Sequence, residues 1–301
     1  MKKHLLFVHI PKTAGTSFRL AALKYFGEKN TFFDYGAREK DTSQIIKKTI
    51  YQEEDIYAFY RETISLEKMF LSGHFLINKY THIFDTLNTI TFVRDPVLQV
   101  ISHYNHFVSH SNYKKDFFSF IKEERFQNIQ SKYLKGKPLE LYGFIGLSEQ
   151  YNKSIEMINR YYDIDLEVLE VNINNDKKIS KDILDTETIL LIEQNNAQDI
   201  QMYEKAKKIF DDRLKCFEKN EIYTHLFIHE KSEKKIRGCA FSKDFDKATK
   251  IGVYLDNKLL KEIDAKDFRP GLLGQNIPRK GFVGFEYRIE KNNSFNNIKV
   301  L

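Results

Sequence analysis

The stretch LLFVHIPKTAGTS, residues 5–17, decides the fold class of this chain. It begins with a short apolar run, residues 5–10, that stops at Pro11, which is the pattern of a central strand in a parallel sheet. Small residues around Gly15 predict a turn, and the apolar positions after it predict an amphipathic helix that stops at Gly27. The stretch therefore predicts a strand that leads through a short loop into a helix N-terminus.

A second unit of the same kind starts at Thr89. The strand-like run ITFVR, residues 90–94, is followed by Asp95, a favourable helix N-cap, and by Pro96, which suits the first helical position. Strands that alternate with helices favour a parallel sheet. We therefore expect an α/β fold, namely a P-loop-like three-layer domain with a central parallel sheet.

The chain changes character in its last quarter. Residues 116–217 read as mostly helical, whereas from about Lys234 short alternating runs separated by turn signals predict a small C-terminal antiparallel β module. The dense charges of residues 218–233 mark a boundary, so we expect an α/β domain over residues 1–222 and the β module over residues 232–301. The sequence leaves open whether the module holds a substrate, covers the first domain or contacts a partner.

Composition excludes several classes of protein. The 301 residues include 42% hydrophobic and 30% charged residues, a globular balance rather than that of a disordered chain. The net charge of +6 comes from lysines scattered among acidic residues, which does not favour a nucleic-acid surface. No apolar run approaches the ~18 residues of a membrane span, and the two cysteines, Cys216 and Cys239, form no CxxC pair. We expect a cytoplasmic protein with reduced thiols, without a membrane span and without a nucleic-acid partner.

The loop that follows the first strand has the chemistry of an anion site. Backbone N–H groups and the helix dipole attract negative charge at a helix N-terminus, Lys12 adds a cation, and hydroxyl groups add donors. The order is not that of a Walker A motif, because Lys12 precedes the only glycine of the loop, Gly15. An ordinary strand–helix turn with an exposed lysine is the alternative. The residues expected to bind the anion are Lys12, Thr13, Ala14, Gly15, Thr16 and Ser17.

A second anion contact is expected at the start of the second unit. Arg94 follows a strand end, and Ser102 lies eight residues further along the next helix. The planar guanidinium of an arginine makes paired, charge-assisted hydrogen bonds to a phosphate. Taken alone, Arg94 fits a structural ion pair equally well.

Together the two segments resemble those of the sulfotransferases that use 3′-phosphoadenosine 5′-phosphosulfate (PAPS). The nearest likeness is to the branch that contains heparan sulfate 2-O-sulfotransferase and bacterial carbohydrate sulfotransferases. PKTAGTS, residues 11–17, resembles the 5′-phosphosulfate loop of that branch, and FVRDPVLQVISHYNHF, residues 92–107, resembles its 3′-phosphate segment. The sequence departs from the family pattern at Gln99 and Gln150, where the family more often has arginine.

Weaker resemblances follow in the same order as in the family. They are GHF (residues 73–75), NIQSKYLKG (128–136), FIGLSEQYNKSIEMI (144–158) and NNAQDIQMYEKAKKIF (195–210). The resemblance thus covers residues 5–217 and stops before the β module.

The resemblance implies a donor and a mechanism. PAPS is the implied donor, with residues 12–17 on its 5′-phosphosulfate and Arg94 and Ser102 on its 3′-phosphate. Lys12 is implied to neutralise charge on the leaving phosphate oxygen, and His74 to take the proton from an acceptor hydroxyl. No metal is required by this chemistry. For His74, a hydrogen-bonded structural histidine is the alternative.

The resembled branch also implies a carbohydrate acceptor, a surface glycan or its precursor, and a bacterial cytoplasmic enzyme. Two other functions stay open. A kinase-like nucleotide phosphotransferase is disfavoured by the missing Walker A order and missing metal carboxylates. A non-catalytic glycan-binding protein with a degenerate nucleotide domain is disfavoured by the intact set Lys12, His74, Arg94 and Ser102.

Two further motifs have simpler interpretations. His103, His106 and His110 share one helical face, so a metal site is conceivable, but we expect them to belong to the 3′-phosphate segment or to face solvent or the acceptor. The triplet RKG, residues 279–281, serves the 3′-phosphate in another sulfotransferase branch. Here it lies inside the β module, where we expect a turn.

Overall fold

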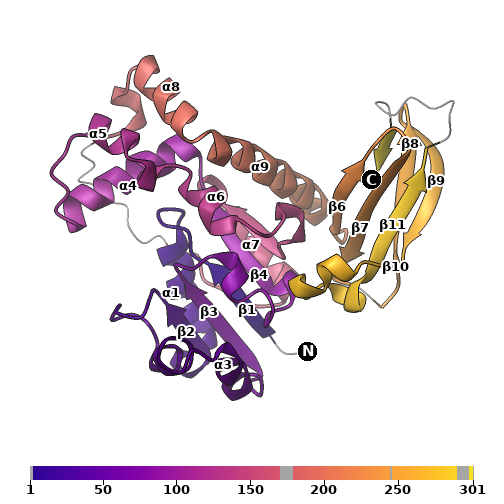
Figure 1. The fold of residues 1–301 in the computed structure, drawn as a ribbon, viewed down its shortest axis with the longest axis horizontal. Coiled ribbons are helices and arrows are strands. Elements are labelled where there is room, and N and C mark those ends of the chain that lie inside the picture. Colours follow the sequence, from indigo (N-terminus) through magenta and orange to yellow (C-terminus); the bar gives the residue numbers. More distant parts are fainter. Residues whose placement is uncertain (1–2, 170–178, 245, 290–297, 301) are drawn as a thin grey trace.

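A five-stranded parallel sheet forms the centre of the N-terminal part of the chain, as the computed structural model shows for the described residues 3–169, 179–244, 246–289 and 298–300 (Figure 1). Its strand order is β2-β3-β1-β4-β5, and each neighbouring pair is parallel. The strands are β1 (Lys3–Val8), β2 (Thr31–Asp34), β3 (Lys68–Gly73), β4 (Thr89–Val93) and β5 (Phe144–Leu147).

Helices flank this sheet, and phenylalanine rings fill the space between them. Phe7 of β1, Phe92 of β4 and Phe18 of the first helix are fully buried, with ring centroids 4.6 to 6.2 Å apart. The helices are α1 (Gly15–Phe26), α2 (Gln44–Ile46), α3 (Ile56–Thr63), α4 (Pro96–His110), α5 (Phe117–Lys122), α6 (Ile129–Leu134), α7 (Tyr151–Tyr162), α8 (Thr186–Asn195) and α9 (Ala197–Glu218).

Both predicted strand–loop–helix units are present, with the predicted signals at their ends. The Asp95 carboxylate accepts the backbone N–H of Leu98 at 2.9 Å, and Pro96 is the first residue of α4. Gly27 ends α1 with a φ of 80°, a conformation that glycine adopts without strain. The α/β fold is therefore confirmed. The expectation that residues 116–217 are mostly helical overlooks one element, because the central-sheet strand β5 lies within them.

The predicted antiparallel β module is confirmed as two packed sheets. The four-stranded sheet has the order β10-β11-β7-β6, and the three-stranded sheet has the order β12-β8-β9. The strands are β6 (Thr224–Lys231), β7 (Lys235–Ser242), β8 (Thr249–Leu255), β9 (Lys258–Ala265), β10 (Asp267–Phe268), β11 (Phe282–Arg288) and β12 (Ile298–Val300).

Turn residues in this module follow backbone chemistry. Asp256 and Asn257 join β8 to β9 with φ values of 49° and 65°, so the turn lies one residue earlier than the Asn257-Lys258 pair that the sequence suggests. Arg279 and Lys280 also have positive φ and form a tight turn before β11, as expected for the RKG triplet.

The antiparallel sheets pack against the α/β part through a buried apolar cluster. Leu87 and Leu141 of the α/β part share this cluster with Cys239, Phe241, Ile277 and Val283, and none of the six is more than 8% exposed. Figure 1 shows α9 leading to these sheets, which lie beyond the β4 side of the central sheet. The junction therefore covers apolar surface on both sides.

Within the described residues, no helix combines the length and the apolar character that crossing a bilayer requires.

Candidate active site

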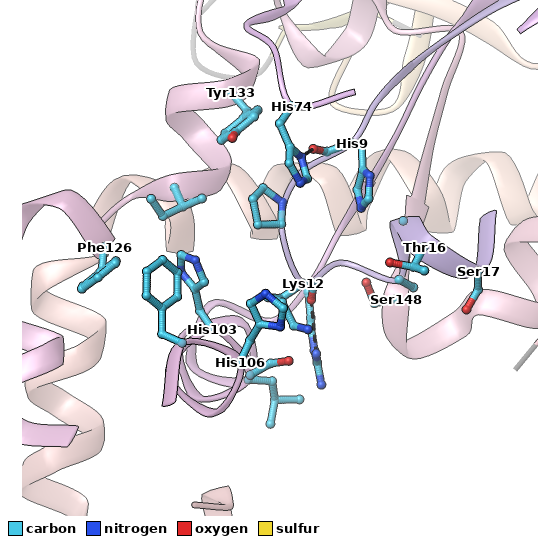
Figure 2. A pocket seen from close by; sticks show the side chains of 18 of the residues that line it. His9, Lys12, Thr16, Ser17, His74, His103, His106, Phe126, Tyr133 and Ser148 are labelled. Carbon is cyan, nitrogen blue, oxygen red and sulfur yellow. Dashed lines mark hydrogen bonds between the residues drawn. The ribbon is translucent and has the colours of Figure 1, made fainter. Parts of the chain in front are cut away.

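The carboxyl ends of β1, β3, β4 and β5 meet at one edge of the parallel sheet, and a cavity of about 660 Å³ opens there. Figure 2 shows side chains from the loops after these strands around it, among them His9, Lys12, His74 and Ser148. Ligands of open α/β sheets bind at this edge, because loops and helix N-termini converge there. The topology thus brings together residues that the sequence analysis selected from separate segments.

The loop between β1 and α1 takes a shape that only a few sequences permit. Lys12 and Ala14 have φ values of 68° and 65°, the left-handed region that side chains other than glycine rarely adopt. Strain of this kind is typical of functional loops. The first turn of α1 carries no acidic residue, so its unpaired N–H groups and dipole present positive charge.

Thr13 is placed differently from its neighbours in this loop. Its side chain is fully buried, and its hydroxyl donates to the carbonyl of Ile10 at 3.0 Å. Lys12, Ala14, Gly15, Thr16 and Ser17 line the cavity, whereas Thr13 is not among the lining residues. The Thr13 hydroxyl therefore stabilises the loop itself in this arrangement, and its contact with a bound anion stays a prediction.

Arg94 lies at the end of β4, opposite the loop. Its Nη1 donates to the carbonyl of Lys12 at 3.2 Å. The backbone N–H of Arg94 donates to Oε1 of the buried Gln130 at 2.9 Å, and Nε2 of Gln130 donates to the Arg94 carbonyl at 2.8 Å. Burial lowers the pKa of Arg94, and burial together with the Arg94 charge lowers the pKa of Lys12. Two partly desolvated cations side by side favour a bound anion between them.

Gln130 is itself held by a network that links two stretches far apart in the sequence. The buried Asp199 carboxylate accepts the N–H groups of Gln130 and Ser131 at 3.0 and 2.7 Å. The Asn128 side chain in turn accepts the N–H groups of Gln198 and Asp199. The stretches NIQSKYLKG and NNAQDIQMYEKAKKIF therefore act together as a support for the Arg94 backbone.

A second cavity of about 770 Å³ continues from the first along α4. Lys12, Thr16, Arg94, Leu98, Ser102 and His106 line both cavities. The predicted pair Arg94 and Ser102 thus shares one wall with Lys12. Gln99, where the family more often has arginine, donates to the carbonyl of Pro11 at 3.1 Å, so an uncharged hydrogen bond ties α4 to the loop.

His74 directly follows β3 and lines the first cavity. Its Nδ1 lies 2.6 Å from the carbonyl oxygen of His9. A carbonyl only accepts, so Nδ1 carries the hydrogen and Nε2 keeps its lone pair. The side chain is exposed in the cavity, yet partial desolvation lowers its pKa, with the His9 hydrogen bond opposing and the Arg19 charge adding to that shift. A neutral imidazole with a free Nε2 can accept a proton.

Several cavity residues were not selected from the sequence. His9 lies beside His74, and His106 lies one helical turn after Ser102. Tyr133 and Phe126 line the far side (Figure 2). The Arg125 guanidinium lies over the Phe126 ring, 4.4 Å from its centroid. The sequence signal for His106 was the helical face that it shares with His103 and His110. The others come from segments without a local signal of function.

The three histidines on one face of α4, His103, His106 and His110, have different surroundings. His103 is buried among aromatic rings, whereas His110 is exposed and stacks on His106 with 4.5 Å between ring centroids. Among the described residues, no three His, Cys, Asp or Glu side chains are grouped as metal ligands would be. These histidines therefore line the two cavities with imidazole groups and do not form a preformed metal site.

The described part of the antiparallel module lies outside these cavities. Of the described residues after 223, none is among those that line either one. The Arg279 and Lys280 side chains belong to the turn before β11, outside both cavities.

Residues 1–211 match the sequence model of the sulfotransferase family. No curated protein matches this chain. Among solved structures, a sulfotransferase from Alicyclobacillus acidocaldarius aligns with 67% of this chain and 94% of its own, with 14% sequence identity and a TM-score of 0.37.

Proposed function

This chain belongs to the sulfotransferase family and is thus an enzyme of sulfuryl transfer, and we propose that its donor is PAPS and its acceptor a hydroxyl group of a carbohydrate. One observation carries the choice of donor: Lys12, Arg94 and Ser102, chosen from two separate segments, line the wall that the two cavities share. A donor with a phosphosulfate at one end and a phosphate at the other needs two anion contacts of this kind.

The residues present fit such a donor. The loop N–H groups and Lys12 suit the phosphosulfate, and the Arg94 guanidinium suits a phosphate. Glu149 is the one carboxylate lining the first cavity among the described residues, and it already accepts the Asp95 N–H at 2.9 Å and the Tyr203 hydroxyl at 3.3 Å. Cavities of this size fall in the ~300–1,000 Å³ range of ligand sites.

In the proposed mechanism each residue has one task. The loop from Lys12 to Ser17, through its backbone N–H groups, holds the 5′-phosphosulfate, and Arg94 and Ser102 hold the 3′-phosphate. The acceptor oxygen bonds to sulfur while the bond from sulfur to the 5′-phosphate oxygen breaks, and that oxygen keeps the electron pair. Lys12 stabilises the charge left there, and Nε2 of His74 takes the proton of the acceptor hydroxyl.

The acceptor class and the setting are proposed from the sequence. The carbohydrate acceptor and a bacterial, cytoplasmic enzyme follow from the resemblance of the loop and of residues 92–107 to one sulfotransferase branch. We also propose the division into an α/β domain, residues 1–222, and a β module, residues 232–301. The change from parallel to antiparallel pairing supports a division of this kind, with β6 (Thr224–Lys231) on the antiparallel side because it pairs with β7.

Calorimetric titration of the whole chain tests the donor and separates the alternatives. Adenosine 3′,5′-bisphosphate should bind more tightly than AMP, and ATP with magnesium should bind more weakly than the bisphosphate. Preference for ATP would favour a phosphotransferase. Binding of none of the three, together with binding of glycans, would favour a non-catalytic glycan-binding protein.

A further inference from the structure

Three neighbouring strands place three aromatic side chains against one another at the sheet edge. Tyr35 follows β2, His74 follows β3 and His9 follows β1, and the sheet order is β2-β3-β1. His74 is therefore the middle member, with Tyr35 and His9 on either side. Its ring centroid is 4.5 Å from that of His9 and 4.8 Å from that of Tyr35.

Hydrogen bonds join the three residues in a chain. The His74 Nδ1–H donates to the backbone carbonyl of His9 at 2.6 Å, and the His9 Nδ1 lies 3.0 Å from the Tyr35 hydroxyl. The hydrogen bond with Tyr35 holds the ring of His9, and the backbone carbonyl of His9 holds His74. Support of this kind sets the tautomer and the direction of an imidazole.

Packing leaves the His9 ring little freedom. It is only 7% exposed, and it occupies the space above the first residue of α1. A Cβ atom on Gly15 would lie 2.0 Å from its Cδ2, so any side chain there would displace the ring. The φ of Gly15 is not positive, so the task of this glycine is to leave room for the His9 ring.

Burial of the cluster, with cationic groups nearby, favours the neutral form of both imidazoles. Burial lowers the pKa of His9 well below its usual value, and the charges of His74, Arg19 and Lys12 add to this shift. Burial also lowers the pKa of His74 and raises that of Tyr35 and of Tyr133, the other ring beside His74. Within this cluster, a proton that arrives during turnover is therefore best stabilised on His74, whose Nδ1–H already faces a carbonyl.

We propose that His9 and Tyr35 are positioning residues that hold the His74 imidazole with Nδ1 protonated and Nε2 free to accept the proton of the acceptor hydroxyl. The proposal rests on the proposed function, in which His74 is the general base. It assigns no contact with the donor to Tyr35. A change at Tyr35 should therefore affect proton transfer and leave binding of the nucleotide unchanged.

The test is a double-mutant cycle of Tyr35→Phe and His74→Ala in the full chain. Tyr35→Phe removes one hydroxyl and keeps the ring, so kcat should fall about tenfold, at the lower end of effects from such supporting residues. The Kd for adenosine 3′,5′-bisphosphate should stay within twofold. In the His74→Ala background, Tyr35→Phe should lower kcat no further, because its effect acts through His74.

Two further variants keep the outcome interpretable. Tyr162→Phe removes a hydroxyl bound to the Leu87 carbonyl at 2.8 Å, away from the site, and should lower Tm without changing kcat. His9→Phe keeps a ring but loses Nδ1, and it should match Tyr35→Phe in the kcat loss. Equal losses from Tyr35→Phe with and without His74, or a kcat equal to that of the wild type, would overturn the positioning role. Full activity of His74→Ala would instead overturn the general base of the proposed function.

Discussion

The Arg94 guanidinium donates a hydrogen bond to the carbonyl oxygen of Lys12, with 3.2 Å between Nη1 and the oxygen. This bond joins the second strand–loop–helix unit to the anion loop of the first. Gln99 makes a parallel connection from α4 to Pro11. A change at Arg94 should therefore alter the loop as well as the contact of Arg94 with its own ligand. A comparison of two nucleotides separates these two effects.

Arg94→Ala should remove most of the preference for adenosine 3′,5′-bisphosphate over AMP. A charge-assisted contact contributes ~1.5–3 kcal/mol, so the affinity ratio of the two nucleotides should fall at least tenfold. Calorimetry with both nucleotides measures this ratio. Loop displacement alone would weaken both nucleotides equally. An unchanged ratio in the variant would show that Arg94 does not read the 3′-phosphate.

Lys12→Met should lower kcat more than it weakens binding of PAPS. The ammonium group is expected to stabilise charge that develops on the leaving oxygen, and loss of such a group costs about 10²–10³ in rate. Methionine keeps most of the apolar part of the lysine side chain and is, like lysine, unbranched. The left-handed backbone conformation at residue 12 should therefore be no harder to adopt in the variant. Single-turnover rates and donor titration in the absence of acceptor give the two quantities. A variant that binds PAPS poorly but turns over normally at saturation would restrict Lys12 to binding.

Activity governed by His74 should persist below pH 6.5. The pKa of His74 in the free protein lies below its usual value, and only the unprotonated imidazole accepts a proton, so the acid limb of kcat/KM, which reports the free enzyme, should have its midpoint below pH 6.5. His74→Ala should abolish this limb and lower kcat by about 10²–10⁴. A pH profile of kcat/KM measures the midpoint of the limb, and the rate under saturating donor and acceptor measures the loss in kcat. An acid limb that survives in His74→Ala would belong to another group.

His103 should make the free protein less stable as the pH falls. It is 7% exposed, its Nδ1 has no hydrogen-bond partner among the described residues, and burial lowers its pKa to about 4. The unfolded chain, with a pKa near 6.5, takes up the proton first. Stability is therefore complete above about pH 6.5 and declines toward pH 4, by about 2 kcal/mol at pH 5.

His103→Phe tests this contribution, because the ring is surrounded by Phe107, Phe120 and Phe126. The variant should lose less stability than the wild type between pH 8 and pH 5, by about 2 kcal/mol in urea unfolding. Parallel pH dependence of the two proteins would assign the acid sensitivity to other buried groups such as His225.

Local signals account for the parts of the fold that the sequence predicted. The Asp95 cap, the Gly27 stop and the apolar strand runs act within a few residues, so each could be recognised from its neighbours. The strand β5 has only four residues and lies between helical segments. A run this short does not show the alternation of apolar and polar residues that indicates a strand. The fold class followed from two such units, but the sheet order did not.

The supporting contacts of the site have no such local signal. Asp199 holds Gln130 across 69 residues, and the His9 carbonyl holds His74 across 65. The first pair exists because helix α6 packs against helix α9, and the second because β1 and β3 are neighbours in the sheet. The sequence therefore selected the candidates that would carry charge or a proton, while the residues that orient them required the structure.

The last prediction concerns the β module, for which the sequence left three roles open. Phe241 is 1% exposed in the cluster that the module shares with Leu87 and Leu141. Phe241→Ala should lower the free energy of unfolding by about 3–5 kcal/mol, since a large buried ring leaves a cavity. The exposed Phe268 is the matched control, and Phe268→Ala should change stability by less than about 0.5 kcal/mol.

Binding of adenosine 3′,5′-bisphosphate by the folded fraction of both variants should equal that of the wild type, because the described module residues line neither cavity. For the same reason, a chain that ends at Lys231 should aggregate or melt early, since Leu87 and Leu141 would lose their cover. Urea unfolding, light scattering and calorimetry make these comparisons. A truncated chain that stays folded, binds the bisphosphate and only shows a higher acceptor KM would mean that the module holds the acceptor instead.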